Sequence, residues 1–377
     1  MSLTPTLADW QARAATLAAS LETRAFIDDE FVAAASGETF ATINPATGET
    51  LADVASCDAA DADNVRVEDG NLLTGGAIQE NRALTVVIEG GEFDGTHEMV
   101  LRAEAAATIA ESRPLDQQFA LLKAAEAAGV TVPKPFWYCG DVGVADKPFY
   151  LMQRIEGEAL GIRITRAGEQ PELAATLGRE LAQIHGIQPP QADLGFLDAV
   201  SASPALDAIA KYRAYLDELP EPHPVLEWTL RWLEVRAPTA GETVLCHRDF
   251  RTGNYMVHEG ALTGVLDWEF AGWGDPHEDV AWFCARCWRF SAPQLDAGGI
   301  AARDVFYTAY EDASGRTLNA ERIAYWETMA HVRWAVIALQ QSMRHRSGEE
   351  PSLELALIGR RLAELEYECL RLTGAMK

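Results

Sequence analysis

Long apolar runs are missing from this chain of 377 residues. A helix that spans a bilayer needs a run of about 18 or more apolar residues, and no such run occurs. Residues Met1–Pro5 also lack the basic segment and the following apolar segment of a secretory signal. These absences predict a cytoplasmic protein with no membrane partner.

Cysteine is scarce, with 6 residues scattered along the chain and no spacing typical of a disulfide framework. Cys284 and Cys287 are the only close pair, and neither a second pair nor histidines at ligand spacing accompany them. The sequence therefore predicts one face of a helix rather than a zinc site. Cys246 is expected to fill a strand as a small apolar residue.

Basic residues are outnumbered, with 31 Lys and Arg against 57 Asp and Glu, which gives a net charge of -26 and a pI near 4.6. This charge argues against nucleic acid and anionic membranes as partners, because both would be repelled. Apolar residues, in contrast, make up 48% of the chain. That content, at this length, is ample for two packed lobes.

The most informative segment is VLCHRDFRTGN at Val244–Asn254, and Asp267 follows it after thirteen residues. Phosphoryl transfer requires a carboxylate that orients and deprotonates the attacking hydroxyl, and oxygen ligands that hold magnesium on the nucleotide phosphates. Asp249 is the expected base. Asn254 and Asp267 are the expected ligands of Mg²⁺.

The spacing between these two ligands has a structural explanation. Tyr255–His258 and Ala261–Leu266, joined by a Glu259-Gly260 turn, predict a short β-hairpin. Such a hairpin would return Asp267 to the neighbourhood of Asn254, so that the two side chains could share one ion.

These residues resemble the aminoglycoside phosphotransferase and choline kinase superfamily, in which His-x-Asp-x-x-x-x-Asn precedes an Asp on the next hairpin. The matching positions are His247, Asp249, Asn254 and Asp267. The resemblance implies an α+β, two-lobed protein kinase-like fold, with a small antiparallel-sheet lobe and a large helical lobe. It also implies transfer of the γ-phosphoryl group of ATP or GTP to a hydroxyl of a small molecule.

The segment Phe270–Trp282 continues this resemblance, since the family has a Gly-Asp-Pro run that leads into a helix. Asp279 would then accept backbone hydrogen bonds from the catalytic loop, and as an acid in a first helical turn it would also complement the helix dipole. His247 is expected to brace the loop rather than to perform chemistry. Arg251 is either a cation that reaches the transferring phosphoryl group or a surface arginine.

Residues 65–152 are expected to form the nucleotide-binding lobe. Gly75, Gly76 and Ala77 lie in a predicted hairpin whose backbone amides would face the phosphates. Arg102 stands where kinases have the lysine that pairs with the α- and β-phosphates, and a guanidinium can hold phosphate oxygens in a fork.

The predicted helix Leu115–Ala125 should present a glutamate to Arg102, but Gln118 occupies the aligned position. Its amide could accept a hydrogen bond from Arg102 without supplying a charge. Glu111 and Asp116 are the alternative acidic partners.

Residues 153–377 are expected to form the helical lobe with the catalytic loop and the acceptor site. At its start, backbone groups of Gln153 to Ile155 resemble the hinge that meets the adenine edge in this family. Apolar spacing of three and four residues then predicts helices, including the patterns 321–344 and 351–372. Trp326, Trp334 and Gln340 are either candidates to line the acceptor site or core residues.

Residues 1–64 are expected to be a separate extension. Phe26–Glu49 resembles the N-terminal segment of aldehyde dehydrogenases, where it forms a surface hairpin, and Asn44–Glu49 is a favourable turn. Neither the cofactor domain nor the nucleophile region of a dehydrogenase is recognisable elsewhere, so dehydrogenase activity is not expected. The extension is a candidate for a fused remnant or for an arm that makes a protein contact or a dimer.

The acceptor stays open between a hydroxyacyl compound and an aminoglycoside or amino alcohol. Two alternatives from other classes also remain. A nucleotide-binding regulator without catalysis is favoured by Gln118 and opposed by the intact set of Asp249, Asn254 and Asp267. A scaffold that acts through residues 1–64 is the other.

Overall fold

The structure is a computed structural model. It describes residues 23–27, 30–33, 38–43, 50–55, 65–73, 79–89, 93–104, 112–199 and 201–376. The chain divides into two compact units. Unit 1 is Met1–Leu73 with Arg82–Val100, and unit 2 is Thr74–Asn81 with Leu101–Lys377. Gly75, Gly76, Ala77, Glu111 and the predicted turn Asn44–Glu49 lie outside the described residues.

Unit 1 begins with two small antiparallel pairs. Strand β1 (Ala25–Ile27) pairs with β2 (Glu30–Val32), and β3 (Thr39–Ile43) pairs with β4 (Thr50–Ala55). These pairs confirm that the N-terminal extension carries a hairpin. Its use as a contact arm stays a prediction.

A five-stranded sheet follows, in the order β5-β6-β7-β9-β8. Its strands are β5 (Val65–Leu72), β6 (Gln79–Ile88), β7 (Gly95–Glu104), β8 (Pro135–Cys139) and β9 (Phe149–Gln153). The pairs β5–β6 and β8–β9 are antiparallel. In unit 2, helix α2 (Leu115–Ala127) packs against β8 and β9 with its buried leucines.

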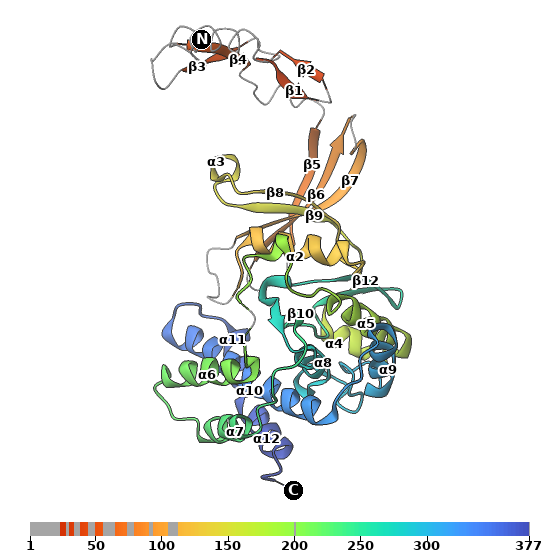
Figure 1. Cartoon of the computed structure of the whole chain (residues 1–377), viewed down its shortest axis with the longest axis vertical. Coiled ribbons are helices and arrows are strands. Elements are labelled where there is room, and N and C mark those ends of the chain that lie inside the picture. Colours follow the sequence, from red (N-terminus) through yellow and green to blue (C-terminus); the bar gives the residue numbers. More distant parts are fainter. Residues whose placement is uncertain are drawn as a thin grey trace, which may run out of the picture. The chain divides into compact units, whose positions relative to one another are not determined.

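Unit 2 is mainly helical (Figure 1). Its further helices are α3 (Val142–Ala145), α4 (Gly161–Arg166), α5 (Pro171–Ile184), α6 (Pro204–Asp217), α7 (Pro224–Val235), α8 (Pro276–Cys284), α9 (Arg303–Ser314), α10 (Ala320–Ser347), α11 (Leu353–Gly359) and α12 (Leu362–Leu372). Short 3-10 turns are Ala192–Leu194, Trp268–Phe270 and Arg286–Trp288. Helix α5 packs along α9, and α10 packs against α8, α11 and α12. None of the helices in the described ranges is long and apolar enough to cross a membrane.

The expected helices at 321–344 and after the hinge are confirmed by α10 and α5. The pattern 351–372, in contrast, forms two helices rather than one. Helix α11 ends at Gly359, where the backbone lies so close to Ser342 of α10 that an added Cβ would stand 2.6 Å from the Ser342 Cβ. Close approach to α10 therefore accompanies the break.

The expected hairpin after the catalytic loop is also confirmed. Strand β11 (Tyr255–His258) pairs antiparallel with β12 (Ala261–Val265). The turn residues Glu259 and Gly260 have φ values of 50° and 82°. Two successive positive φ values are typical of the tight turns whose twist matches that of the strands.

Two hydrophobic cores meet at helix α8. Val280 and Phe283 belong to the core that includes α2, α5 and the β11–β12 hairpin, whereas Ala281 and Trp282 belong to the core of α6, α7, α10 and α12. This helix is nine residues long and is buried on nearly all sides. Its position fixes the residues in its first turns against the catalytic loop.

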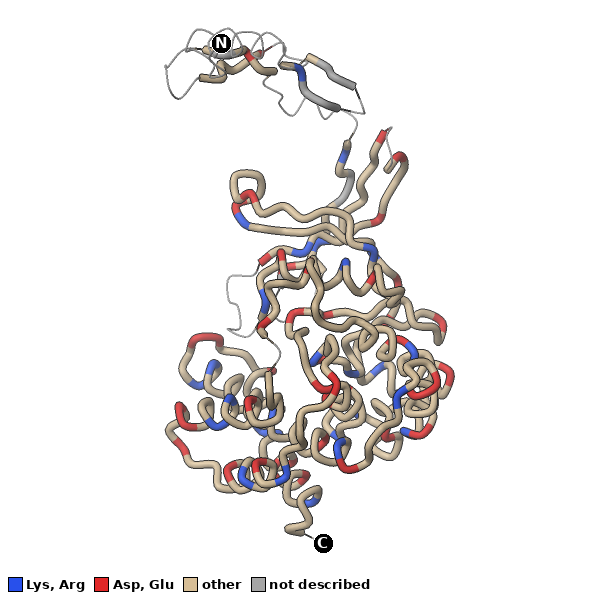
Figure 2. Tube along the Cα trace, viewed as in Figure 1, with Lys and Arg blue, Asp and Glu red and all other residues tan. Residues whose placement is uncertain are grey.

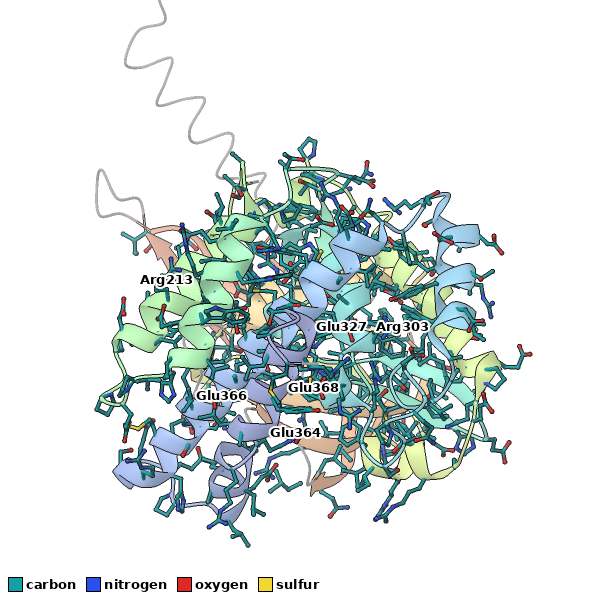
Figure 3. All side chains as sticks on the ribbon, turned by 90° about the horizontal axis from the view of Figure 1, so that it is seen from below. Arg213, Arg303, Glu327, Glu364, Glu366 and Glu368 are labelled. Atoms are coloured by element: carbon teal, nitrogen blue, oxygen red, sulfur yellow. The ribbon has the colours of Figure 1, made fainter. Side chains whose placement is uncertain are left out.

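Charged residues serve both the surface and the interior of unit 2. Figure 2 shows acidic and basic residues interspersed along its helices, which suits a solvated surface. In the interior, Glu327 of α10 pairs with Arg303 and Arg289 at 3.4 Å each. Arg303 and Glu327 are labelled beside each other in Figure 3. Arg303 joins α9 to α10, and Arg289 joins the end of the 3-10 turn Arg286–Trp288 to α10. Breaking one partner of a buried pair is strongly destabilising.

Candidate active site

The predicted catalytic loop follows strand β10 (Val244–Cys246), which pairs with β13 (Gly272–Gly274). Within the loop, Arg248 has a φ of 63°. A positive φ is uncommon for a residue with a side chain, and such strain is often found at functional sites. This conformation directly precedes Asp249.

The Asp249 carboxylate accepts hydrogen bonds from three side chains. Trp282 Nε1 of α8 donates to Oδ1 over 3.0 Å, Arg251 Nε donates to the same oxygen over 3.1 Å, and Asn254 Nδ2 donates to Oδ2. The Asp249 side chain is only 13% exposed. The Arg251 guanidinium also stacks 4.5 Å from the ring centre of Trp288. The structure thus places Arg251 on the carboxylate itself, with both groups held in fixed orientations.

Asp279 lies beneath the loop and accepts two backbone N–H groups, from His247 over 2.6 Å and from Arg248 over 2.7 Å. It is fully buried, and His185 Nε2 lies 3.3 Å from Oδ2. Burial opposes its ionisation, but the hydrogen bond from His185 and the nearby charges hold the pKa of Asp279 below its usual range. The charged form is therefore stable where it holds the loop.

His247 links the loop to the hairpin. Its Nδ1 accepts the backbone N–H of Asp249 over 3.2 Å, and its Nε2 donates to the Leu266 carbonyl over 2.9 Å. Burial lowers the pKa of His247. A neutral ring fits both contacts, because one nitrogen accepts while the other donates.

The hairpin brings the two expected metal ligands together. The Leu266 N–H donates to the Asn254 carbonyl over 2.8 Å, so Asp267 lies beside Asn254. Asp267 has a φ of 61° and a ψ of 63°, which turns the chain immediately after β12. Arg102 Nη1 lies 3.1 Å from Asp267 Oδ1. Arg102 therefore joins the same cluster, although it comes from β7.

Among the described residues, Asp267 and Glu269 are acidic groups near Arg102. Gln118 is buried, and its amide nitrogen donates to the Arg113 carbonyl over 2.6 Å. Glu269 instead lies near Arg102 and Asp267, and burial raises the pKa of its carboxyl while Ser112 Oγ donates to it over 2.6 Å. Sequence reasoning missed Glu269, although it stands two residues after Asp267.

One backbone N–H of the expected hinge is hydrogen-bonded within the protein. The Gln153 N–H donates to the Lys134 carbonyl over 2.8 Å. The Ile155 side chain lies against Gly264 of β12, because an added Cβ there would stand 2.5 Å from Ile155 Cδ1. Ile155 thus contributes packing as well as backbone groups.

The three cysteines considered in the sequence lie in the interior. Cys284, Cys287 and Cys246 are buried, and the Cys246 thiol donates to the Asp275 carbonyl over 3.4 Å. Burial raises the pKa of the Cys246 thiol well above its ordinary value. A protonated, buried thiol is not a nucleophile.

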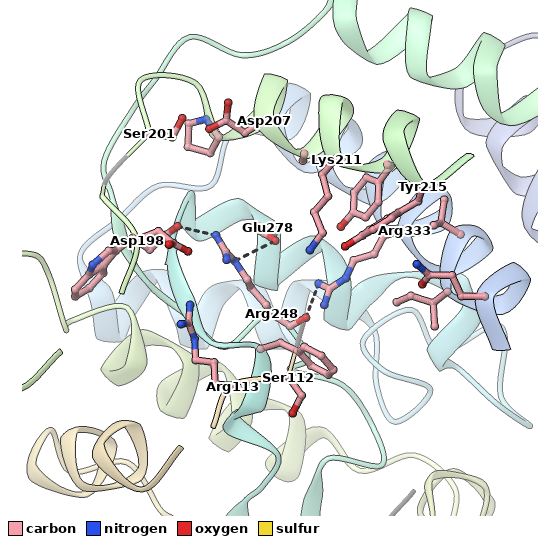
Figure 4. A pocket seen from close by; sticks show the side chains of 18 of the residues that line it. Ser112, Arg113, Asp198, Ser201, Asp207, Lys211, Tyr215, Arg248, Glu278 and Arg333 are labelled. Carbon is pink, nitrogen blue, oxygen red and sulfur yellow. Dashed lines mark hydrogen bonds and ion pairs between the residues drawn. The ribbon is translucent and has the colours of Figure 1, made fainter. Parts of the chain in front are cut away.

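A cavity of about 900 Å³ lies beside the catalytic loop (Figure 4). Arg248 lines it from the loop, and Glu278 lines it from α8. Of the late-helix candidates, Trp326 and Gln340 line the cavity. Trp334 packs instead on Trp288, with ring centres 4.7 Å apart. A cavity of this size and position suits a small-molecule acceptor.

Comparison with known proteins shows to which family the chain belongs. The model of the phosphotransferase enzyme family matches residues 69–316, more than half of the chain. The chain belongs to this family. Membership confirms the expected class of enzyme, a phosphotransferase of the small-molecule kinase type.

Solved structures agree on the fold. An aminoglycoside phosphotransferase-like protein from Ralstonia eutropha superposes with a TM-score of 0.66 at 22% identity, covering 83% of this chain and 93% of that one. Spectinomycin phosphotransferase in complex with ADP and spectinomycin has a TM-score of 0.58 at 12% identity, with coverage of 80% and 93%. These likenesses confirm the expected two-lobed protein kinase-like fold.

The curated relatives are longer proteins. Acyl-CoA dehydrogenase family member 10 of Mus musculus is 28% identical over 208 residues, which are 50% of this chain and 18% of that protein. Member 11 of Homo sapiens is 25% identical over 259 residues, which are 65% of this chain and 33% of that protein. A match of 53 residues at 58% identity, 14% of this chain, to aminoacetaldehyde dehydrogenase of Pseudomonas aeruginosa covers 10% of that protein. It gives limited support to the resemblance noted for residues 1–64.

Proposed function

We propose that this phosphotransferase moves the γ-phosphoryl group of ATP to a hydroxyl of a small molecule, with Asp249 as the base. The observation that supports this proposal best is the convergence of three oxygen-bearing side chains. Asn254 donates to Asp249, and Asp267 lies beside Asn254 through the hydrogen bond that closes the hairpin. A base and two hard-cation ligands at one point are what phosphoryl transfer requires.

The donor atoms suit Mg²⁺. Because the amide nitrogen of Asn254 is used on Asp249, its amide oxygen is the atom left to bind an ion. The Asp267 side chain is 39% exposed and can offer a carboxylate oxygen. An oxygen-only donor set is the one that Mg²⁺ prefers, and the ion would neutralise charge on the nucleotide phosphates. Asn254 and Asp267 would therefore hold it.

Arg102 supports a phosphate-binding role in this proposal. Its side chain is 10% exposed, and its Nε is buried without a hydrogen-bond partner in the described part of the chain. A buried, unsatisfied guanidinium nitrogen is costly unless a ligand completes it. A phosphate oxygen would do so. ATP is the favoured donor, since a structural neighbour has ADP bound.

Side chains of this protein would take the proton of the acceptor hydroxyl and orient the base. Asp249 would accept a hydrogen bond from the acceptor hydroxyl and take its proton as the oxygen attacks the γ-phosphorus. Trp282 and Arg251 fix the carboxylate plane through their bonds to Oδ1. The Arg251 cation also lies close enough to the base to offset charge that builds up on the transferring group.

The test is a turnover assay with purified protein, Mg-ATP or Mg-GTP, and a panel of hydroxylated acceptors, followed by release of nucleoside diphosphate. Asp249→Asn should lower acceptor-dependent turnover by about a hundredfold or more, because general base catalysis contributes on that order. The exposed Asp304→Asn is the matched control and should leave turnover unchanged. Turnover that survives in Asp249→Asn would disprove the assignment. Nucleotide binding without turnover would favour the regulator.

A further inference from the structure

The cavity beside the catalytic loop is lined by five basic and five acidic residues. Its basic residues come from four separate parts of the chain, namely Arg113, Lys211, Arg248, Arg333 and Arg344. Basic residues are thus enriched at the cavity, because the whole chain has 31 basic and 57 acidic residues. Figure 4 shows Arg113, Lys211, Arg248 and Arg333 around one space. Because the two signs are equal in number, the class of ligand depends on which of these charges are already paired.

Arg113 and Arg248 are held by backbone carbonyls on either side of Gly272. Arg113 Nε donates to the Ala271 carbonyl over 2.6 Å, and Arg248 Nη2 donates to the Trp273 carbonyl over 2.7 Å. An added Cβ on Gly272 would lie 2.8 Å from Arg248 Nη1 and 3.2 Å from Arg113 Nη2. The two guanidinium groups therefore converge over one residue that has no side chain.

Not every one of these cations has a carboxylate within ion-pair distance. Within the described ranges, no carboxylate lies within 4 Å of a basic nitrogen of Arg113 or Arg333, and Arg248 has Glu278 at 3.7 Å. Arg344 is different, because it pairs with Glu349 and Glu350. Burial and then the charge of Arg248 lower the pKa of Arg113, against the effect of Asp198. Arg113 and Arg248 thus repel each other, and an anion between them would relieve that repulsion.

Arg333 connects the pair formed by Arg113 and Arg248 to the candidate base. Its guanidinium stacks 4.4 Å from the ring centre of Trp282, and Nη1 donates to the Arg248 carbonyl. Trp282 in turn donates to Asp249. An acceptor whose hydroxyl reaches Asp249 would therefore have its remaining part beside Arg333 and Arg248.

We propose that this cavity binds acceptors that carry a carboxylate or phosphate group, with Arg113 and Arg248 as the principal anion ligands and Arg333 between the anion and the base. Planar guanidinium groups match both kinds of anion in paired hydrogen bonds. These three guanidinium groups would repel a cationic amino alcohol or aminoglycoside. The inference rests on the proposed function and narrows its acceptor class to hydroxylated anions.

Pairs of acceptors that differ in charge but little in shape test the proposal. With Mg-ATP, turnover is compared for glycerol 3-phosphate against glycerol, for 3-hydroxybutyrate against 3-hydroxybutyramide, and for ethanolamine. The anionic member of at least one pair should have a kcat/KM about tenfold or more above its neutral partner, since one such charged contact supplies that difference. The pair with the larger ratio identifies carboxylate or phosphate as the anion. A preference for neutral or cationic acceptors would overturn the proposal.

Two variants test whether the anion of the acceptor binds at Arg113 and Arg248. Arg113→Met removes one anion ligand, and Gly272→Ala places a methyl group where both guanidinium groups converge. Each should raise the KM of the anionic acceptor by about tenfold while leaving the KM of ATP unchanged. Arg179→Met, an exposed arginine on α5, is the matched control. Equal effects of Arg113→Met and Arg179→Met would overturn the proposal.

Direct binding distinguishes this inference from the proposed function. Inorganic phosphate and 3-hydroxybutyrate are titrated calorimetrically into wild type, Arg113→Met and Arg179→Met. If no acceptor is turned over, phosphoryl transfer fails, yet anion binding weakened about tenfold by Arg113→Met alone would still support the anion site. If neither anion binds wild type, or if Arg113→Met binds both as wild type does, the anion site is refuted whatever the turnover.

Discussion

The indole nitrogen of Trp282 donates a 3.0 Å hydrogen bond to Oδ1 of Asp249. Trp282 is almost fully buried in α8, and its ring lies beneath the Arg333 guanidinium. One side chain thus orients the candidate base and packs against Arg333, which lines the cavity. Its position follows from the packing of α8 between the two cores.

Replacing Trp282 with Phe should therefore slow turnover without weakening nucleotide binding. The change keeps most of the ring and removes one hydrogen bond to a charged oxygen, which is worth about 1.5–3 kcal/mol, so kcat should fall at least about tenfold. Steady-state kinetics measure this. Trp334→Phe is the control, because the buried Trp334 nitrogen has no hydrogen-bond partner in the described residues. An equal loss of kcat in both variants would contradict the orienting role.

Arg102 should determine nucleotide affinity through its fork geometry as well as its charge. Arg102→Lys keeps the charge but cannot bond Asp267 and a phosphate oxygen in the same plane. We expect ATP affinity to fall by about tenfold, with a smaller effect on the acceptor KM. Calorimetric titration of the nucleotide checks this. Arg179→Lys should bind ATP as wild type does, and unchanged affinity in Arg102→Lys would remove Arg102 from the phosphate site.

The parts of the site that lie close together in the sequence could be predicted, and the parts that packing brings together could not. Asp249 and Asn254 share one loop, and a turn at Glu259-Gly260 is enough to bring Asp267 back to them. Motif spacing and turn chemistry carry that information.

Trp282 and Arg113 illustrate the other case. Trp282 reaches Asp249 only because α8 is buried between two cores, and a tryptophan in a helix is more often a core residue. Arg113 approaches Arg248 across Gly272, from a position before α2 that has no motif. Helix α12 shows the same limit for the fold, since the break after Gly359 depends on contact with α10.

Buried histidines should make the fold sensitive to mild acid. Burial lowers the pKa of His331 and of His185 below the ordinary 6.5. His331 faces Glu327, Glu368 and Arg289, and His185 faces Asp279, Tyr310, Arg316 and Glu242. A depressed folded-state pKa gives stability that is fully present above 6.5 and is lost as pH falls toward the folded value.

Urea unfolding at about pH 7.5, 6.0 and 5.0, values that lie above and below the ordinary histidine pKa, should therefore show a falling free energy of unfolding. His331→Gln keeps a donor for the Glu327 carbonyl and removes one titrating group, so its free energy should fall less steeply. His258→Gln, at an exposed position, is the control. A slope in His331→Gln equal to that of wild type would exclude His331 as a contributor.

Asp279 should combine stability and catalysis, because it is fully buried and both of its oxygens accept N–H groups of the catalytic loop. In Asp279→Asn one of these oxygens becomes an NH₂ group that faces a backbone N–H, so a donor meets a donor. The free energy of unfolding should fall by about 3 kcal/mol, as expected when a buried charge-assisted pair is broken. Because the loop carries Asp249, kcat should also fall by at least about tenfold in protein that is still folded.

Hydrogen exchange of the His247 and Arg248 amides separates this effect from general destabilisation. In Asp279→Asn these two amides should exchange faster than those of β12, which Asp279 does not contact. Asp275→Asn is a matched control, because Asp275 caps the same helix through the His277 N–H but does not bond the loop. If both variants lost kcat in proportion to their stability, Asp279 would act only through the fold. A loss of kcat confined to Asp279→Asn would show that its two hydrogen bonds set the position of the base.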